Sequence, residues 1–212
     1  MTSPSPFFNR IAHKYDASVK KGPNYAARIQ RCAQWLGPHA NVLDAGCASA
    51  HITLDLAPHV AHIHGVDIAQ TLIQLAQQRA AQQRINNARF SRASIDDPQF
   101  DHLAGTFDAV TCFSLLHLVD DPAATLRRFH HLLKPNGQLI LEAPCLADFS
   151  LPLRALIIPL MQWIGKAPPL VYFSVPQLEQ MTRDAGFDLL ESTIYNPKSS
   201  QQALHARKPA TP

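Results

Sequence analysis

The sequence predicts an α/β fold: a doubly wound sheet of seven strands, mostly parallel, with an antiparallel strand at the C-terminal end and an N-terminal helical lid. Two observations predict it. Between residues 41 and 143, short apolar runs alternate with helix-like segments of about ten to fifteen residues, which is the pattern of parallel βαβ units. After residue 186, two apolar runs are joined by a turn-forming tetrapeptide, which predicts a hairpin and one strand of opposite direction.

The segment 7–35 is expected to form two short helices that break near Gly22 and Pro23. Apolar side chains recur at helical spacing in the first of them: Phe8, Ile11, Ala12 and Tyr15. These helices make residues 1–40 an N-terminal lid, and residues 41–212 are expected to form the main domain.

Five apolar runs predict the parallel strands, in the order 41–45, 61–68, 88–94, 107–115 and 138–143. Helices are expected between them over 52–57 and 71–83, and the second is rich in Ala, Gln and Leu. Asp121 and Pro122 open a third helix as N-cap and first-turn residue, and the turn at 134–137 ends it. Right-handed crossovers of this kind place helices on both faces of the sheet.

The C-terminal part begins with a helix over 174–185, which is capped by its first residue, a serine, and ended by Gly186. Strands are expected at 187–195 and 201–207, joined by the turn at 196–199. This hairpin supplies the last two strands of the sheet.

An apolar insertion, residues 146–173, lies between the fifth strand and this C-terminal helix. Its longest apolar stretch, 151–164, is about one helix long and is interrupted by Arg154, Pro159 and Gln162. A segment of that length cannot cross a bilayer, so no stable membrane insertion is expected.

Composition excludes several classes of protein. Of the 212 residues, 46% are hydrophobic and 17% are charged, and the formal net charge is +3. These values are ordinary for one globular domain and argue against disorder. The basic residues are scattered, so a surface that follows a phosphate backbone is not expected and nucleic acid is excluded as a partner.

The cysteines predict buried thiols and no metal site. They form no CxxC pair and have no histidine at ligand spacing: Cys32, Cys47, Cys112 and Cys145. Apolar runs flank most of them, which is typical of core thiols in a reducing compartment. Residues 1–9 lack an apolar signal core, so a cytoplasmic location is expected. The sequence does not indicate an oligomeric state.

The most informative stretch is residues 42–50, Val-Leu-Asp-Ala-Gly-Cys-Ala-Ser-Ala, where a strand runs into a loop of small residues and then a helix. Such a loop lets the backbone approach a ligand closely at the carboxyl end of a sheet. The next strand ends in an acid, Asp67, which follows Gly46 by twenty-one positions. An acid at that place can accept both ribose hydroxyls of a nucleoside.

Taken together, these motifs resemble the class I S-adenosylmethionine-dependent methyltransferases, nearest to the bacterial small-molecule branch that includes quinone-biosynthesis C-methyltransferase-like proteins. The resemblance covers about residues 8–209. Its matching segments are 8–12, 15–16, 42–47, 65–68, 107–110, 115–122, 132–137, 173–178 and 185–187. It implies a Rossmann-like fold, S-adenosyl-L-methionine as cofactor, and methyl transfer to a small, partly hydrophobic acceptor.

The resemblance also implies roles for residues around the methionine end of the cofactor. Asp44, Gly46 and Cys47 would line that end, and Ala48 continues the same loop. Tyr15, on the N-terminal helix, would close over the amino-acid moiety.

By the same resemblance, Asp67 would hold the ribose and Ile68 would pack on the adenine. Ser94 stands where the family usually has an acid that accepts from the adenine amino group, and Ile95 would present its backbone N–H to the ring. Phe113, just past the fourth strand, would lie beside the carboxylate and methyl region.

The chain departs from the family pattern in two places. Ala48 and Ala50 replace glycines of the loop, so their methyl groups would crowd the cofactor or demand an unfavourable backbone angle. Ser94 replaces the adenine-side acid and would leave one charge-assisted bond weaker. These departures support an alternative: a non-catalytic or weakly binding protein of the same fold that acts as a scaffold or regulator.

Methyl transfer from a sulfonium needs mainly alignment of donor and acceptor. A general base is required only where the acceptor must lose a proton. The candidates are His117, His13 and His51, and His117 is preferred because it follows the fourth strand, where acceptors usually approach. The alternative for His117 is a packing or capping histidine.

Motifs that would indicate other classes of enzyme match this sequence less well. Pro144–Cys145 resembles the nucleophile motif of RNA cytosine methyltransferases, and 195–197 resembles an amino-methylating motif, but each follows the wrong strand. A nicotinamide-dependent oxidoreductase requires G-x-G-x-x-G, whereas this loop has Gly46, Ala48 and His51.

The apolar insertion 146–173 is expected to shape a hydrophobic acceptor pocket or to make peripheral contact with a membrane that carries the acceptor. The alternative is simple packing against the sheet.

Overall fold

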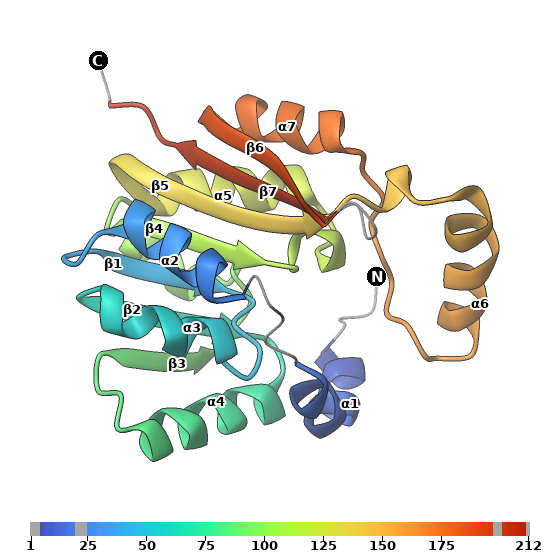
Figure 1. Cartoon of the computed structure of the whole chain (residues 1–212), viewed down its shortest axis with the longest axis horizontal. Helices are drawn as coiled ribbons and strands as arrows, with labels where there is room; N and C mark the ends of the chain where they lie inside the picture. The colour runs from blue at the N-terminus through green and yellow to red at the C-terminus, as the bar shows by residue number, and fades with distance from the viewer. Residues whose placement is uncertain (1–4, 20–24, 197–200, 211–212) are drawn as a thin grey trace.

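A seven-stranded sheet organises the protein, as seen in a computed structural model that describes residues 5–19, 25–196 and 201–210 (Figure 1). The strand order within these residues is β3-β2-β1-β4-β5-β7-β6. The strands are β1 (Asn41–Ala45), β2 (His62–Asp67), β3 (Ala88–Arg92), β4 (Phe107–Phe113), β5 (Leu133–Pro144), β6 (Asp188–Asn196) and β7 (Gln201–Arg207).

The pairing of the strands confirms the predicted topology. Strands β1 to β5 pair in parallel, and β7 pairs antiparallel with both β5 and β6. Strand β1 lies between β2 and β4, so the chain reverses its direction of winding there. In doubly wound sheets, ligands bind in the crevice outside the carboxyl ends of the strands at such a switch point.

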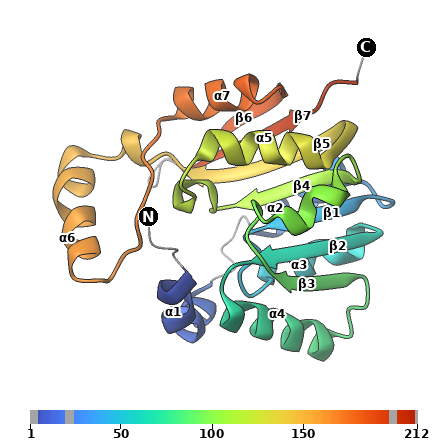
Figure 2. The same cartoon turned by 180° about the vertical axis from the view of Figure 1, so that it is seen from behind.

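Helices cover both faces of the sheet. The helices are α1 (Ser5–Ser18), α2 (Tyr25–Leu36), α3 (His51–Leu56), α4 (Gln70–Gln83), α5 (Pro122–Leu132), α6 (Ile158–Trp163) and α7 (Val175–Asp184). Helices α2 and α3 lie on the face towards the viewer in Figure 1, and α5 and α7 lie on the opposite face (Figure 2). Short 3-10 turns lie at Ala57–His59, Pro98–Leu103, Leu116–Leu118 and Leu146–Asp148, and a π turn at Leu153–Ile157.

Two apolar cores, one on each face, explain why the strand runs are continuously hydrophobic. Leu126 and Phe129 of α5 pack with Leu178 of α7 in the larger cluster, and Ile29 and Leu36 of α2 belong to the other. A strand buried on both faces cannot alternate polar and apolar residues. Burial of such side chains is worth about 1.5–3 kcal/mol each.

The residues predicted to cap or end helices do so in the structure. The Asp121 side chain accepts from the Ala124 N–H at 2.9 Å, with Pro122 in the first turn of α5. Ser174 and Gln177 form a reciprocal capping box at α7. Gly186 ends that helix with φ +94°, which a glycine adopts without strain.

Some predicted boundaries are wrong. Strand β5 begins at Leu133 instead of residue 138, because Leu133 pairs with Phe107 of β4 across a bulge. The apolar stretch 151–164 is a π turn followed by the short α6, with Pro159 in the first turn of α6. The predicted helix break at 22–23 and most of the hairpin turn, 197–199, lie outside the described residues.

Candidate functional site

A cavity of about 480 Å³ lies at the carboxyl ends of β1, β2, β3 and β4. This is the crevice that the topology predicts. Its walls come from the loops after these strands, from α1 and from the start of α5. The lining residues are Phe8, Tyr15, Gly46, Ala48, Val66, Asp67, Ile68, Leu72, 93–96, Phe113–Leu115, Leu118–Asp121 and Ala124.

The loop after β1 has a left-handed backbone at several positions. Gly46, Ala48 and Ala50 have φ of +74°, +48° and +64°. A side chain at Gly46 would also lie 3.1 Å from Leu115, so glycine is required there on two counts. The predicted unfavourable backbone angle at both alanines is confirmed, and such conformations cost a non-glycine residue roughly 1–3 kcal/mol each.

The methyl groups of these alanines do not fill the cavity. Ala48 lines the cavity wall, whereas Ala50 is fully buried in a cluster with Leu54, Ala76 and Ala80. The loop therefore has a glycine-like backbone path at both alanines and leaves space for a ligand.

Hydrogen bonds that the loop donates to acceptors on β2 hold it in place. The Gly46 and Cys47 N–H groups both donate to the Val66 carbonyl, at 2.8 and 3.0 Å. The Ala48 N–H donates to Asp67 Oδ2 at 3.1 Å, and the Ala69 N–H donates to Asp67 Oδ1 at 2.8 Å.

The Asp67 carboxylate faces the cavity from the end of β2. Burial raises the pKa of Asp67, and backbone N–H groups of Ala69, Ala48 and Ile68 oppose that shift. A carboxylate has about four lone-pair sites, so it retains capacity to accept from a hydroxyl group of a ligand. Asp67 thus has the position and the capacity that the sequence predicts for a ribose ligand.

Asp44 is fully buried behind the loop. Its two carboxylate oxygens accept from the Thr53 and Thr111 hydroxyls, and these bonds link β1 to α3 and β4. Burial raises the pKa of Asp44 to about 6. Asp44 and Cys47 line a smaller cavity of about 70 Å³ next to the main one, together with Tyr15 and Gly46.

The loop after β3 brings together two predicted residues and one that the sequence did not reveal. Ser94 and Ile95 line the cavity, as does Asp96. The Ser94 hydroxyl accepts from the Asp96 N–H at 3.3 Å. Burial raises the pKa of Asp96, although Arg128 acts in the opposite direction. An acid is therefore present on this wall, two positions after the place where the family pattern puts it.

The loop after β4 forms an apolar wall that begins with Phe113. The Arg28 guanidinium stacks over the Phe113 ring at 4.9 Å. Leu115, Leu118 and Val119 continue this wall along the cavity.

His117 is half-buried and is not among the described residues that line the cavity. Burial lowers the pKa of His117 to about 4, so the ring is neutral near pH 7. Its Nδ1 has no hydrogen-bond partner within the described residues, and its carbonyl accepts from the Val171 N–H at 2.8 Å. Its role as a base stays a prediction.

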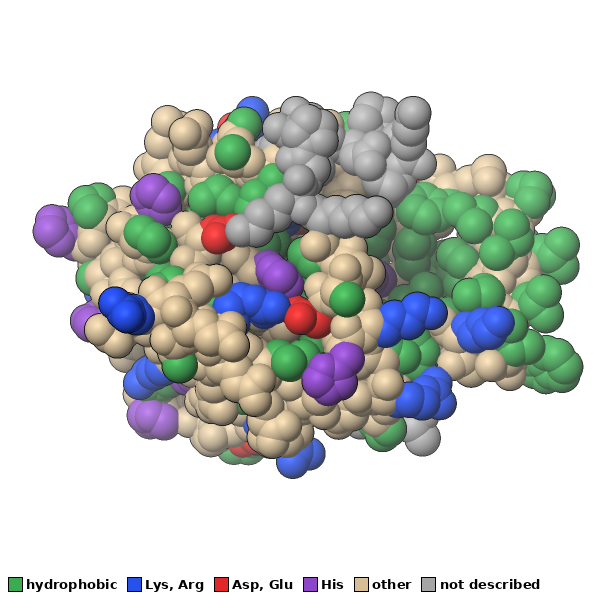
Figure 3. Space-filling model, turned by 60° about the horizontal axis from the view of Figure 1, so that its bottom comes forward, with side chains coloured by type: hydrophobic (Ala, Val, Ile, Leu, Met, Phe, Trp, Pro, Cys, Tyr) green, Lys and Arg blue, Asp and Glu red, His purple; other side chains and the backbone are tan. Residues whose placement is uncertain are grey.

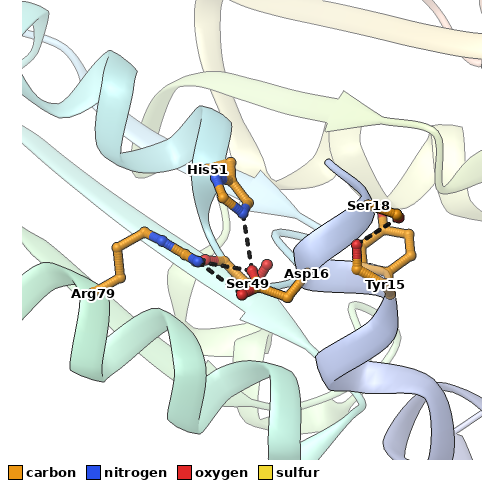
Figure 4. A network of polar contacts seen from close by, with 6 residues as sticks. All are labelled: Tyr15, Asp16, Ser18, Ser49, His51 and Arg79. Carbon is orange, nitrogen blue, oxygen red and sulfur yellow. Dashed lines mark hydrogen bonds and ion pairs between the residues drawn. The ribbon is translucent and has the colours of Figure 1, made fainter. Parts of the chain in front are cut away.

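Helix α1 is fastened over the cavity by a polar network that the sequence did not reveal (Figure 4). Asp16 on α1 pairs with Arg79 of α4 at 2.7 Å and with His51 of α3 at 2.9 Å. Arg79 also donates to the Ser49 carbonyl in the strained loop. Burial raises the pKa of Asp16, but hydrogen bonds that include those from Arg79 and His51 bring it below its usual value.

Three of the residues predicted for the site lie on helices α1 and α3. His51, a candidate base, is engaged with Asp16 instead. His13 is exposed on α1. Tyr15 lines the cavity from α1, and burial raises its pKa. No local sequence pattern indicates this network, because Asp16 and Arg79 are 63 positions apart.

The competing motif at Pro144–Cys145 has no accessible nucleophile. Cys145 is fully buried at the end of β5, and burial raises its pKa to about 12. A thiol of that pKa is not a nucleophile at neutral pH. The interpretation of Cys145 as a strand-end core residue is confirmed. In the described ranges, no three His, Cys, Asp or Glu side chains are grouped so that they could hold a metal ion.

Comparisons with known proteins define the class. Residues 15–192 match the family described as "Methyltransferase domain". Among curated proteins, the ubiquinone biosynthesis O-methyltransferase of Xanthomonas axonopodis pv. citri is 32% identical over 140 residues, which are 64% of this chain and 58% of that protein. The protein of the same name from Pseudomonas aeruginosa is 34% identical over 141 residues, 64% of this chain and 60% of that protein. This chain thus spans somewhat more than half of their length.

Among solved structures, the putative methyltransferase in a Haloferax volcanii complex with the Trm112 methyltransferase activator superposes with a TM-score of 0.78. It is 15% identical, and the match covers 99% of each chain. At this identity the likeness shows the fold alone.

The fold is Rossmann-like, and the family match defines a methyltransferase domain. The chain belongs to the methyltransferase-domain family, and the expected likeness to quinone-biosynthesis methyltransferases is confirmed. Its curated relatives are named for O-methylation, whereas the sequence resemblance named the C-methylating type. The scaffold alternative finds no support in these comparisons.

Proposed function

We propose that this protein transfers the methyl group of S-adenosylmethionine to a hydroxyl oxygen of a small, partly hydrophobic acceptor. The observation that carries the proposal is a single cavity with an acidic wall after β2 and β3 and an apolar wall after β4. The relatives' names support oxygen as the methylated atom. When bound, the cofactor supplies an electrophilic methyl group with a good leaving group.

The acidic wall would hold the nucleoside. Asp67 accepts the ribose hydroxyls, and Ile68 and Ile95 pack on the two sides of the adenine. Asp96 accepts from the adenine amino group in place of the acid missing at Ser94. Desolvated charge-assisted hydrogen bonds of this kind are worth about 1.5–3 kcal/mol each.

The loop after β1 and helix α1 would hold the amino-acid end. The left-handed backbone of Gly46 and Ala48 brings the main chain close to the ligand, and Cys47 and Asp44 support the loop from behind. Tyr15 closes this end, since Asp16 fastens α1 to the main domain.

The apolar wall would position the acceptor. Leu118 and Val119 contact its hydrophobic part, and Phe113 lies beside the carboxylate and methyl region of the cofactor. His117 is the candidate base from behind this wall, because its ring is neutral near pH 7 and its Nδ1 is unpaired among the described residues. A pKa near 4 makes it a weak base, so alignment supplies most of the acceleration.

A labelled-methyl assay tests this proposal. Phenolic acceptors with and without an apolar side chain are offered to the wild type and to His117→Gln. We expect transfer to oxygen, with a lower KM for the acceptor that carries the apolar side chain. No transfer to any hydroxyl acceptor, with cofactor binding intact, contradicts oxygen as the methylated atom. A kcat for His117→Gln within about threefold of the wild type removes His117 from the role of base.

A further inference from the structure

Residues 151–164 form an apolar arm that stands away from the sheet. In Figure 1 the arm projects to one side of the molecule, and α6 packs chiefly on the π turn that precedes it. Trp163 is 84% exposed, Leu156 67% and Leu151 64%. The other large apolar side chains exposed on the arm are Ile157, Leu160, Met161 and Ile164.

These side chains form one continuous surface, which Figure 3 shows as a cluster of hydrophobic atoms on the projection. At helical spacing, residues 156, 157, 160, 161, 163 and 164 fall on one broad stripe. Single exposed apolar residues are ordinary, but a contiguous patch with an exposed tryptophan marks an interaction surface.

The sequence of the arm and of the residues that follow it is basic. The sequence has no Asp or Glu from Phe149 to Leu178, and its charged residues there are Arg154 and Lys166. At the base of the arm, the exposed Arg10 of α1 donates to the Gly165 carbonyl at 2.7 Å. Such a surface complements anionic lipid headgroups, which attract nearby Lys and Arg side chains with about 1 kcal/mol each.

The shape of the arm favours a lipid surface over a protein groove. The arm projects from the body (Figure 1) and carries Trp163 together with branched aliphatic side chains, which is the composition of elements that lie in the interface between headgroups and acyl chains. No helix in the described ranges is both long enough and apolar enough to span a bilayer, so the contact is peripheral.

The C-terminal part of the insertion is tied at two points to walls of the cavity. The Gly165 carbonyl is bonded to α1, whose Phe8 lines the cavity, and the Val171 N–H is bonded to His117 in the loop after β4. A lipid-docked arm would therefore hold the mouth of the cavity close to the membrane surface.

We propose that the apolar arm docks this protein on an anionic lipid bilayer, so that a membrane-borne hydrophobic acceptor enters the cavity from the lipid side. The identity of the acceptor rests on the function proposed above, whereas the docking itself does not.

Vesicle flotation tests the docking. The probes are vesicles of phosphatidylcholine alone and vesicles of phosphatidylcholine with phosphatidylglycerol. Wild-type protein is expected to bind the anionic vesicles more tightly, with weaker binding at high salt. The double variant Leu156→Ser, Trp163→Ser is expected to lose about tenfold or more in partitioning. Lys166→Glu should weaken binding to the anionic vesicles only.

The matched control is Leu190→Ser, which removes an exposed leucine of β6 outside the arm and should leave partitioning unchanged. Equal binding by the arm variant and the wild type overturns the proposal, as does absence of wild-type binding. A self-association seen by light scattering that the arm variant abolishes, without vesicle binding, assigns the arm to a second copy of the chain and also overturns it.

Binding of S-adenosylhomocysteine separates this proposal from the proposed function. The arm variants should bind S-adenosylhomocysteine as the wild type does, because the arm lies outside the cavity lining. Vesicle binding without any S-adenosylhomocysteine binding would leave docking in place and remove the enzymatic proposal.

Discussion

The two walls of the cavity are built in different ways. The cofactor wall comes from loops after β1, β2 and β3, and backbone hydrogen bonds fix it, such as those from Gly46 and Cys47 to Val66. The acceptor wall comes from α1 and the loop after β4, and its side chains are mostly apolar and partly buried. For the function proposed above, the difference implies that the cofactor is held by the rigid sheet, while the acceptor is recognised by elements added around it.

The largest expected effect concerns Asp44, the buried anchor of the cofactor wall. Its folded pKa of about 6 exceeds the unfolded value of 3.8, so between these values the folded state binds more protons. The stabilisation is therefore fully present below pH 3.8 and is lost as the pH rises through 6. The loss amounts to about 3 kcal/mol.

The Asp44→Asn variant has no carboxyl group to titrate. Urea unfolding of both proteins across this pH range should show the wild type losing stability relative to the variant as the pH rises. The buried histidines are present in both proteins and cancel in the difference. Parallel stability curves would mean that Asp44 is not the desolvated anchor described above.

The Asp96→Asn variant tests whether Asp96 accepts from the adenine amino group at the cofactor wall. An asparagine can donate to the 6-oxo group of S-inosylhomocysteine, whereas the carboxylate accepts from the adenine amino group. The preference for S-adenosylhomocysteine over the inosyl analogue should fall by about tenfold, measured by calorimetry. The control is Asp120→Asn, which changes another acid on the cavity lining. An equal change in both variants would assign the effect to general charge.

The smallest expected effect concerns the strained loop. Ala48→Gly removes a methyl group from a left-handed position and should raise the free energy of unfolding by up to about 1 kcal/mol. Ala50→Gly relieves the same strain but loses buried packing, so its stability should change less. Thermal unfolding of the two variants measures the contrast. A loss of stability in Ala48→Gly would contradict the strain argument.

The two walls also differ in how much of their structure the sequence predicts. Strand β1 coincides with the predicted residues 41–45, and Asp121 and Ser174 cap the helices as expected, because these signals are local. The placement of Asp67 beside the loop after β1 follows from parallel topology alone. The main elements of the cofactor wall could therefore be predicted from the sequence.

The rest depends on contacts between distant segments. Asp16 and Arg79 meet only once α1 folds over α4, and the place of Asp96 on the wall depends on the path of the loop after β3. The early start of β5 is set by Leu133 pairing with Phe107. The arm has helical spacing, but no pattern in it predicts that it projects from the body.

Calorimetric titration with S-adenosylhomocysteine tests the central claim most directly, comparing the wild type with Asp67→Ala. The account predicts that the variant folds and loses about hundredfold or more in affinity, since two charge-assisted hydrogen bonds to the ribose are removed. A folded Asp67→Ala protein that binds S-adenosylhomocysteine as tightly as the wild type would contradict it.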